Sequence, residues 1–164
     1  MQNIGNDVNQ VKISNLSKIQ GQDDILGNSI MDFSKFRQEV NENFKFEFVS
    51  YDNLSNLEKT TYNTTHNFFE LLGGKPSNLK EIIISETMQK DDYTYRPSEG
   101  IWDPPTGRII IKRTALSSKE RFIAIFLHEL AHCSSGAPDS TRIFESELTK
   151  YLGLLGNKAI ESLE

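Results

Sequence analysis

The stretch from Arg108 to His132 decides the fold, and it reads RIIIKRTALSSKERFIAIFLHELAH. Three consecutive isoleucines between two basic residues are typical of a buried strand, over residues 108–112. The capping-box sequence from Ser117 to Glu120 then predicts the start of a helix. The mostly apolar segment from Phe122 to Leu130 predicts that this helix is buried within the domain. A strand that leads directly into a buried helix favours an α+β fold.

Similar patterns predict the other elements. Strict alternation over residues 44–48 and an isoleucine run over residues 81–84 each indicate a strand. A second capping box, Ser55 with Glu58, opens a helix predicted to run to residue 72, before Gly73-Gly74. We therefore predict an α+β domain in which a mixed or antiparallel sheet of about three to five strands packs against the helix after Ser117 and further helices.

The chain of 164 residues has the length of a single domain. Residues 1–30 are rich in Asn, Gln, Asp, Ser and Gly, which indicates a flexible arm or linker. A short helix is predicted over residues 31–40, because Phe33, Phe36 and Val40 recur at helical spacing. The domain is expected over residues 31–156, with a tail over residues 157–164.

Charge and hydropathy exclude several classes of partner. The net charge is −5 and no block is rich in Lys or Arg, so no nucleic-acid partner is expected. The longest wholly apolar run, residues 122–127, is far shorter than the about 20 residues that span a bilayer, and no secretory signal is visible. Together with the single cysteine, Cys133, these features predict a cytoplasmic protein without a membrane partner.

Residues His128 to His132 read His-Glu-Leu-Ala-His. Helical residues four apart lie on one face within about 6 Å, so both imidazoles can bind one metal ion. Glu129 projects at a neighbouring angle, where a carboxylate can act as a general base on water without being a ligand. The remaining histidine, His66, has no partner at ligand spacing and is interpreted as a surface residue. Cys133 is interpreted as a packing residue.

A catalytic zinc site usually has three protein ligands, so one more is expected. Asp139 follows a loop that turns the chain back, but it also precedes Ser-Thr-Arg, where an Asp is a favoured helix N-cap. Glu145 and Glu147 lie on the predicted next helix. Glu147 falls within its apolar stripe and Glu145 at its edge, so periodicity slightly prefers Glu147. The residues alone leave all three carboxylates open.

From Arg108 to Thr149 the chain resembles the zincin metallopeptidases. In their gluzincin branch the third ligand is a Glu on the helix after HExxH, commonly within Glu-x-x-Ala-Asp/Asn. The segment Glu145-Ser-Glu-Leu-Thr is similar to that pattern, with Leu148 in place of Ala and Thr149 in place of Asp or Asn. The resemblance therefore implies a zinc site of His128, His132 and Glu145. The short interval after the histidines keeps Asp139 as the alternative third ligand.

The resemblance implies a small zincin-like domain that hydrolyses peptide bonds of a protein or peptide substrate, with Zn²⁺ activating water and Glu129 as the catalytic base. It also implies that an extended peptide lies along a sheet edge, at the 108–112 strand or a neighbour. Tyr93, Tyr95 and Arg96 are candidates to stabilise the oxyanion. Three alternatives remain open: a non-catalytic zinc-binding interaction module, a metal-dependent hydrolase of non-peptide substrates, and fusion to or regulation by an upstream domain or partner protein.

Overall fold

The computed structural model describes residues 44–90 and 97–164. The chain divides into two units, Met1–Phe44 and Lys45–Glu164, and the second carries the elements described below. The arm predicted over residues 1–30 and the helix over residues 31–40 lie outside the described residues. The same is true of the oxyanion candidates Tyr93, Tyr95 and Arg96.

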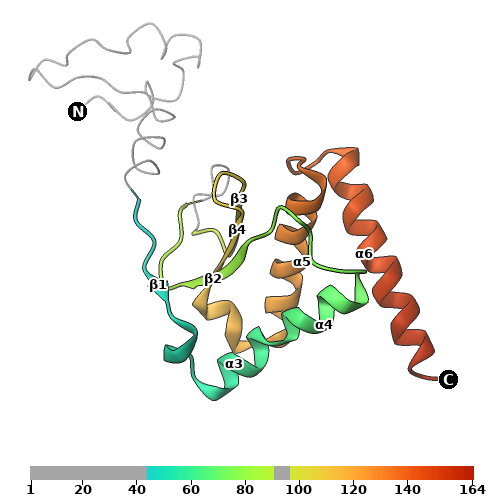
Figure 1. Ribbon diagram of the computed structural model, residues 1–164, viewed down its shortest axis with the longest axis horizontal. Coiled ribbons are helices and arrows are strands. Elements are labelled where there is room, and N and C mark those ends of the chain that lie inside the picture. Colours follow the sequence, from blue (N-terminus) through green and yellow to red (C-terminus); the bar gives the residue numbers. More distant parts are fainter. Residues whose placement is uncertain (1–43, 91–96) are drawn as a thin grey trace, which may run out of the picture. The chain divides into compact units, whose positions relative to one another are not determined.

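The second unit is an α+β fold with a mixed sheet, which confirms the predicted class (Figure 1). The strands are β1 (Phe48–Val49), β2 (Glu81–Ser85), β3 (Gly100–Asp103) and β4 (Arg108–Lys112). The α-helices are α3 (Asn56–Tyr62), α4 (Thr64–Leu71), α5 (Lys119–Ser135) and α6 (Arg142–Glu161), and 3-10 helices cover Tyr51–Asn53 and Arg113–Ser117.

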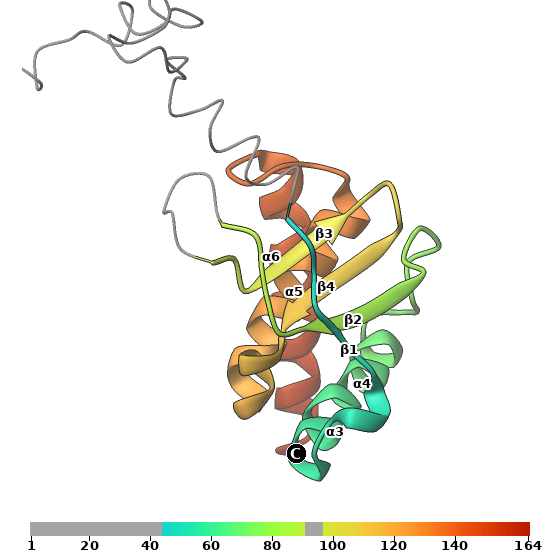
Figure 2. The same cartoon turned by 90° about the vertical axis from the view of Figure 1, so that its left-hand side faces the viewer.

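The strand order is β1-β2-β4-β3, so the predicted 108–112 strand is internal and β3 lies at an edge (Figure 2). β2 and β4 are parallel, with Ile83 opposite Ile110. β3 runs antiparallel to β4, and β1 runs antiparallel to β2. The patterns did not predict β3, because a run of four residues beginning with Gly and ending with Asp is too short to show alternation.

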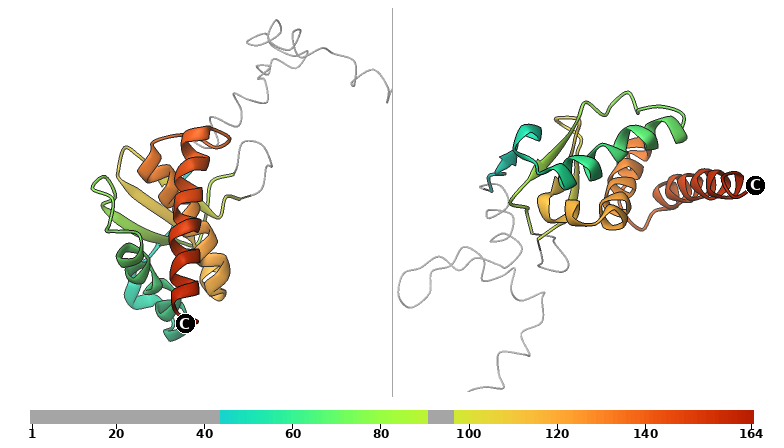
Figure 3. Two further views of the ribbon diagram at one scale, coloured as in Figure 1. Left: turned by 90° about the vertical axis from the view of Figure 1, so that its right-hand side faces the viewer. Right: turned by 90° about the horizontal axis from the view of Figure 1, so that it is seen from below.

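Helix α5 packs against β3 and β4, and α6 lies along the side of α5 that faces away from the sheet (Figure 3). Phe122 and Phe126 of α5 are fully buried, and the Phe69 ring of α4 meets Phe126 edge-on at 5.7 Å. Burial of each such ring stabilises the fold by about 1.5 to 3 kcal/mol. The core therefore fixes the face that α5 turns to the sheet.

Several predicted element boundaries differ in the structure. The helix predicted over residues 55–72 is two helices that meet at Asn63. The Asn63 side-chain amide donates a hydrogen bond to Tyr51 Oη at 3.0 Å, and Thr64 Oγ1 donates to the Thr61 carbonyl at 2.6 Å. Such side-chain bonds compete with a continuous helix. The Ser55–Glu58 capping box is confirmed.

The helix carrying His128 is capped by Ser118 rather than Ser117. Ser118 Oγ accepts from the Arg121 amide, because Ser117 belongs to the preceding 3-10 helix. The strand expected over residues 44–48 is reduced to Phe48–Val49, because the Glu47 amide bonds the Thr87 side chain instead of a strand partner. The last helix runs on to Glu161, into the segment assigned to a tail. No helix in the described ranges is both long and apolar enough to cross a membrane.

Candidate metal centre and catalytic cleft

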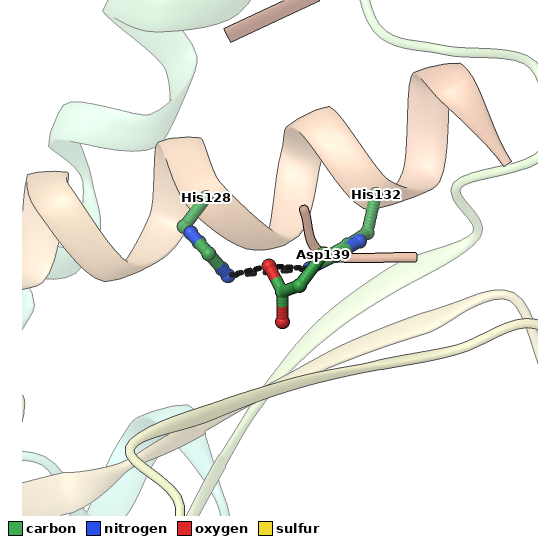
Figure 4. A group of neighbouring side chains, drawn as sticks. All are labelled: His128, His132 and Asp139. Atoms are coloured by element: carbon green, nitrogen blue, oxygen red, sulfur yellow. Dashed lines mark hydrogen bonds and ion pairs between the residues drawn. The ribbon is translucent and has the colours of Figure 1, made fainter. Parts of the chain in front are cut away.

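The two histidines of the motif point to the same spot from adjacent turns of α5 (Figure 4). Their Nε2 atoms lie 3.2 Å apart. His132 Nδ1 lies 2.8 Å from the carbonyl oxygen of Ala137, which only accepts hydrogen bonds, so the proton of this ring is held at Nδ1. The lone pair of His132 Nε2 is thereby directed toward His128, and that orientation is typical of a metal-binding imidazole.

Asp139 completes the group. The helix ends at Gly136, whose φ of 64° is favourable for glycine, and the following turn brings Asp139 back over the histidines. Asp139 Oδ1 lies 3.2 Å from His128 Nε2 and 3.3 Å from His132 Nε2. The interpretation of Asp139 as a helix cap is wrong, because Thr141 caps α6 by accepting from the Phe144 amide. The Asp139 carboxylate therefore does not cap α6.

The three ligand atoms form a nearly equilateral triangle with sides of 3.2, 3.2 and 3.3 Å. A tetrahedral zinc with bonds of about 2.0 to 2.1 Å places neighbouring ligand atoms about 3.3 to 3.4 Å apart. Because the proton of His132 is held at Nδ1, its Nε2 lone pair faces this triangle, and a divalent ion at its centre would contact all three ligand atoms. The donor set therefore fits one divalent ion. Among the described residues, this is the one group of His, Cys, Asp and Glu side chains that could hold a metal.

Glu129 lies next to this group and is 7% exposed. Burial raises the pKa of its carboxyl to about 7, although His132 and a hydrogen bond from the Trp102 amide lower it. Asp139 raises it further. Gly100 of β3 packs so closely that a Cβ there would lie 2.8 Å from Glu129 Oε1. The edge strand therefore holds the carboxylate from two sides, with a main-chain donor and a close steric contact.

Phe144 of α6 is a site residue that the sequence patterns assigned only to the apolar stripe. Its ring stacks on His132 with centroids 4.3 Å apart and meets His128 edge-on at 4.9 Å. Phe144 is itself buried. Its contacts with both rings restrict the orientation of the two imidazoles. A stripe of apolar residues does not reveal which of them covers a ligand.

The other predicted carboxylates lie elsewhere. Glu145 is exposed on the first turn of α6 and is not part of the metal-binding group. Glu147 pairs with Lys150 at 3.1 Å. His66 is exposed, and Cys133 is buried with its thiol bonded to Asn78, as their sequence contexts predicted.

A cleft of about 1180 Å³ runs along α5 and opens over the group. β3 forms one wall, α5 the floor, and the Gly136–Asp139 turn closes one end. Comparison with protein-family models, curated proteins and solved structures found no match to this chain. The geometry of the cleft therefore carries the functional argument.

Proposed function

We propose that the chain is a zinc-dependent peptidase, with His128, His132 and Asp139 as the metal ligands and Glu129 as the general base. The proposal rests on the triangle of His128, His132 and Asp139 ligand atoms, with the buried Glu129 carboxylate beside it. Zinc in such a site supplies Lewis acidity, which polarises a carbonyl group and activates water. Asp139 replaces Glu145 in the ligand set that the resemblance to gluzincins implies.

The position of Glu129 suits proton transfer. Burial raises the pKa of the Glu129 carboxyl above its ordinary value, which favours a group that can both accept and return a proton. A Glu129 carboxylate oxygen would take a proton from the water that adds to the peptide carbonyl carbon. The same group would deliver that proton to the amine as the carbon–nitrogen bond breaks.

The edge of β3 supports a peptide as the substrate. The Lys112 amide donates to the Glu99 carbonyl, so in this antiparallel pair Glu99 and Ile101 direct their main-chain groups to β4. Gly100 and the Trp102 carbonyl point to the other side, where the described residues place no further strand, while the Trp102 amide donates to Glu129. An extended peptide can add there by main-chain hydrogen bonds.

A catalytic zinc site also needs an open coordination position for water or substrate. The described residues offer three candidate ligands, which would leave a fourth position open.

The test compares wild-type protein with Glu129→Gln. Bound zinc is measured by mass spectrometry, and peptide cleavage is followed in a library derived from digested proteins. We expect both proteins to hold one zinc, and cleavage to fall about 100- to 10,000-fold in the variant. Glu120→Gln makes the same change at an exposed position of α5 and is the matched control. Equal cleavage by wild type and Glu129→Gln would refute the proposed base.

A further inference from the structure

β3 and α5 run in the same direction along the cleft, so its two ends are lined by different residues. At one end, Arg121 near the start of α5 forms an ion pair with Glu99, just before β3. At the other end, Asn78 donates to the Cys133 carbonyl of α5 and lies against Gly107, in the turn after β3. The metal-binding group and Gly100 lie between these ends.

The charges of the cleft are largely offset. The carboxylates that line it are Glu99, Glu129 and Asp139, and none of the described lining residues is Lys or Arg. Glu99 is neutralised by Arg121. A divalent ion would offset the negative charge of the carboxylates beside it. Since the described lining offers no Lys or Arg to pair with an acidic substrate side chain, selection depends on the apolar surface.

Apolar residues line both ends of the cleft, with Pro97, Ala124 and Ile125 nearer Arg121, and the largest of them, Trp102, lies toward the other end. Trp102 faces α5 from the same side of β3 as Gly100, about 7 Å further along the strand. Pro104 follows β3, and Ala137 and Pro138 belong to the turn that carries Asp139. These four residues line the cleft beside the metal-binding group. Together they form an apolar wall next to the position where a peptide bond would be cleaved.

We infer that this wall, made of Trp102, Pro104, Ala137 and Pro138, selects a substrate with a bulky apolar side chain; the inference rests on the proposed peptidase function. A peptide added antiparallel to β3 enters at Trp102 and leaves at Glu99. The apolar residue therefore lies within two positions on the N-terminal side of the cleaved bond. The substrate class is an extended, uncharged segment with an aromatic or large aliphatic residue at that place.

Binding tests the selectivity without requiring catalysis. The zinc-loaded Glu129→Gln protein is titrated with three capped peptides of sequence Gly-Ala-Xaa-Gly-Ala-Gly, in which Xaa is Phe, Lys or Glu. We expect the Phe peptide to bind about 10- to 100-fold more tightly than the other two, as burial of an aromatic ring in an apolar site predicts. Equal binding, absence of binding, or preference for a charged peptide would overturn the inference.

Two variants locate the selectivity. Trp102→Ala should abolish the preference for Phe while zinc binding is retained. Because Trp102 also packs against the core, Pro104→Glu provides a second variant at an exposed turn position. It should shift the preference toward the Lys peptide, and an unchanged order of affinities would contradict the assigned wall. Leu152→Ala on the exposed surface of α6 is the control and should leave the order unchanged.

Cleavage by wild-type protein then separates this inference from the proposed function. Cleaved bonds preceded within two positions by an apolar residue would support both. Selective binding of the Phe peptide without cleavage would refute the peptidase and leave the wall as a peptide-binding surface. Cleavage with the apolar residue after the bond, or with no apolar preference, would overturn the inference while the peptidase stands.

Discussion

Replacement of Asp139 by Asn should remove the proposed third zinc ligand. The carboxylate oxygen lies 3.2 and 3.3 Å from the two Nε2 atoms, which matches the ligand spacing of a tetrahedral zinc. A zinc site of four ligands binds with about 10 to 16 kcal/mol in total, or about 2.5 to 4 kcal/mol for each ligand. At 1.4 kcal/mol for a tenfold change, the Kd for zinc should rise by about 60- to 700-fold.

The assay is a competition titration with a chromophoric zinc chelator, performed on wild type, Asp139→Asn, Glu145→Gln and Glu147→Gln. The two glutamate variants are matched controls, because each removes one carboxylate charge from α6 without touching the histidines. Their Kd values should stay within about threefold of wild type, because neither carboxylate belongs to the His128–His132–Asp139 group and charges away from the site are screened by salt. The reasoning is refuted if Asp139→Asn binds zinc like wild type, or if Glu145→Gln shows the larger loss.

Three further changes test the surroundings of the site. Gly100→Ala would place a Cβ 2.6 Å from Ile125 Cγ2 and 2.8 Å from the Glu129 carboxylate, so we expect a stability loss of about 1 to 3 kcal/mol in thermal unfolding and a lower kcat, with zinc stoichiometry unchanged. Phe144→Ala removes the ring that packs on both imidazoles and should cost about 3 to 5 kcal/mol in denaturant unfolding and weaken zinc binding, whereas Phe144→Leu should cost less. The pKa of Glu58 is lowered from 4.5 to about 2, chiefly by its hydrogen bond with Arg113, so this carboxylate stabilises the fold above pH 4.5 and loses that effect as the pH falls toward 2. Arg113→Gln should therefore lower stability at pH 7 and flatten its acid dependence in urea titrations between pH 4.5 and 2. An unchanged acid dependence would contradict the pairing.

The long, regular patterns of the sequence predicted the elements that position the site. The isoleucine runs form β2 and β4, and the apolar segment after Phe122 forms the buried part of α5. These signals are strong because each element is buried on most sides, so nearly every position must be apolar. His128, Glu129 and His132 then follow from helical spacing alone.

The features that the sequence patterns did not predict depend on contacts between residues distant in the sequence. The break at Asn63 comes with a bond to Tyr51, and β3 exists because it pairs with β4 across a tight turn. The cap of α6 could not be assigned to Thr141 from its neighbours, since Asp139 and Thr141 are both favoured cap residues. Asp139 is brought beside the histidines by a backbone turn whose Ser140 has a φ of 61°, which local propensity does not favour.

The same turn explains why Asp139 and not Glu145 reaches the histidines. In α6 successive side chains are about 100° apart, so only one of Phe144 and Glu145 can face the metal-binding group. Phe144 takes that place, with its ring against both imidazoles, and Glu145 is directed to solvent. A helix register that presented Glu145 would move Phe144 out of the core and expose the rings it covers. The packing of α6 therefore leaves the place beside both histidines to a residue of the preceding turn, and the proposed metal ligands come from α5 and that turn.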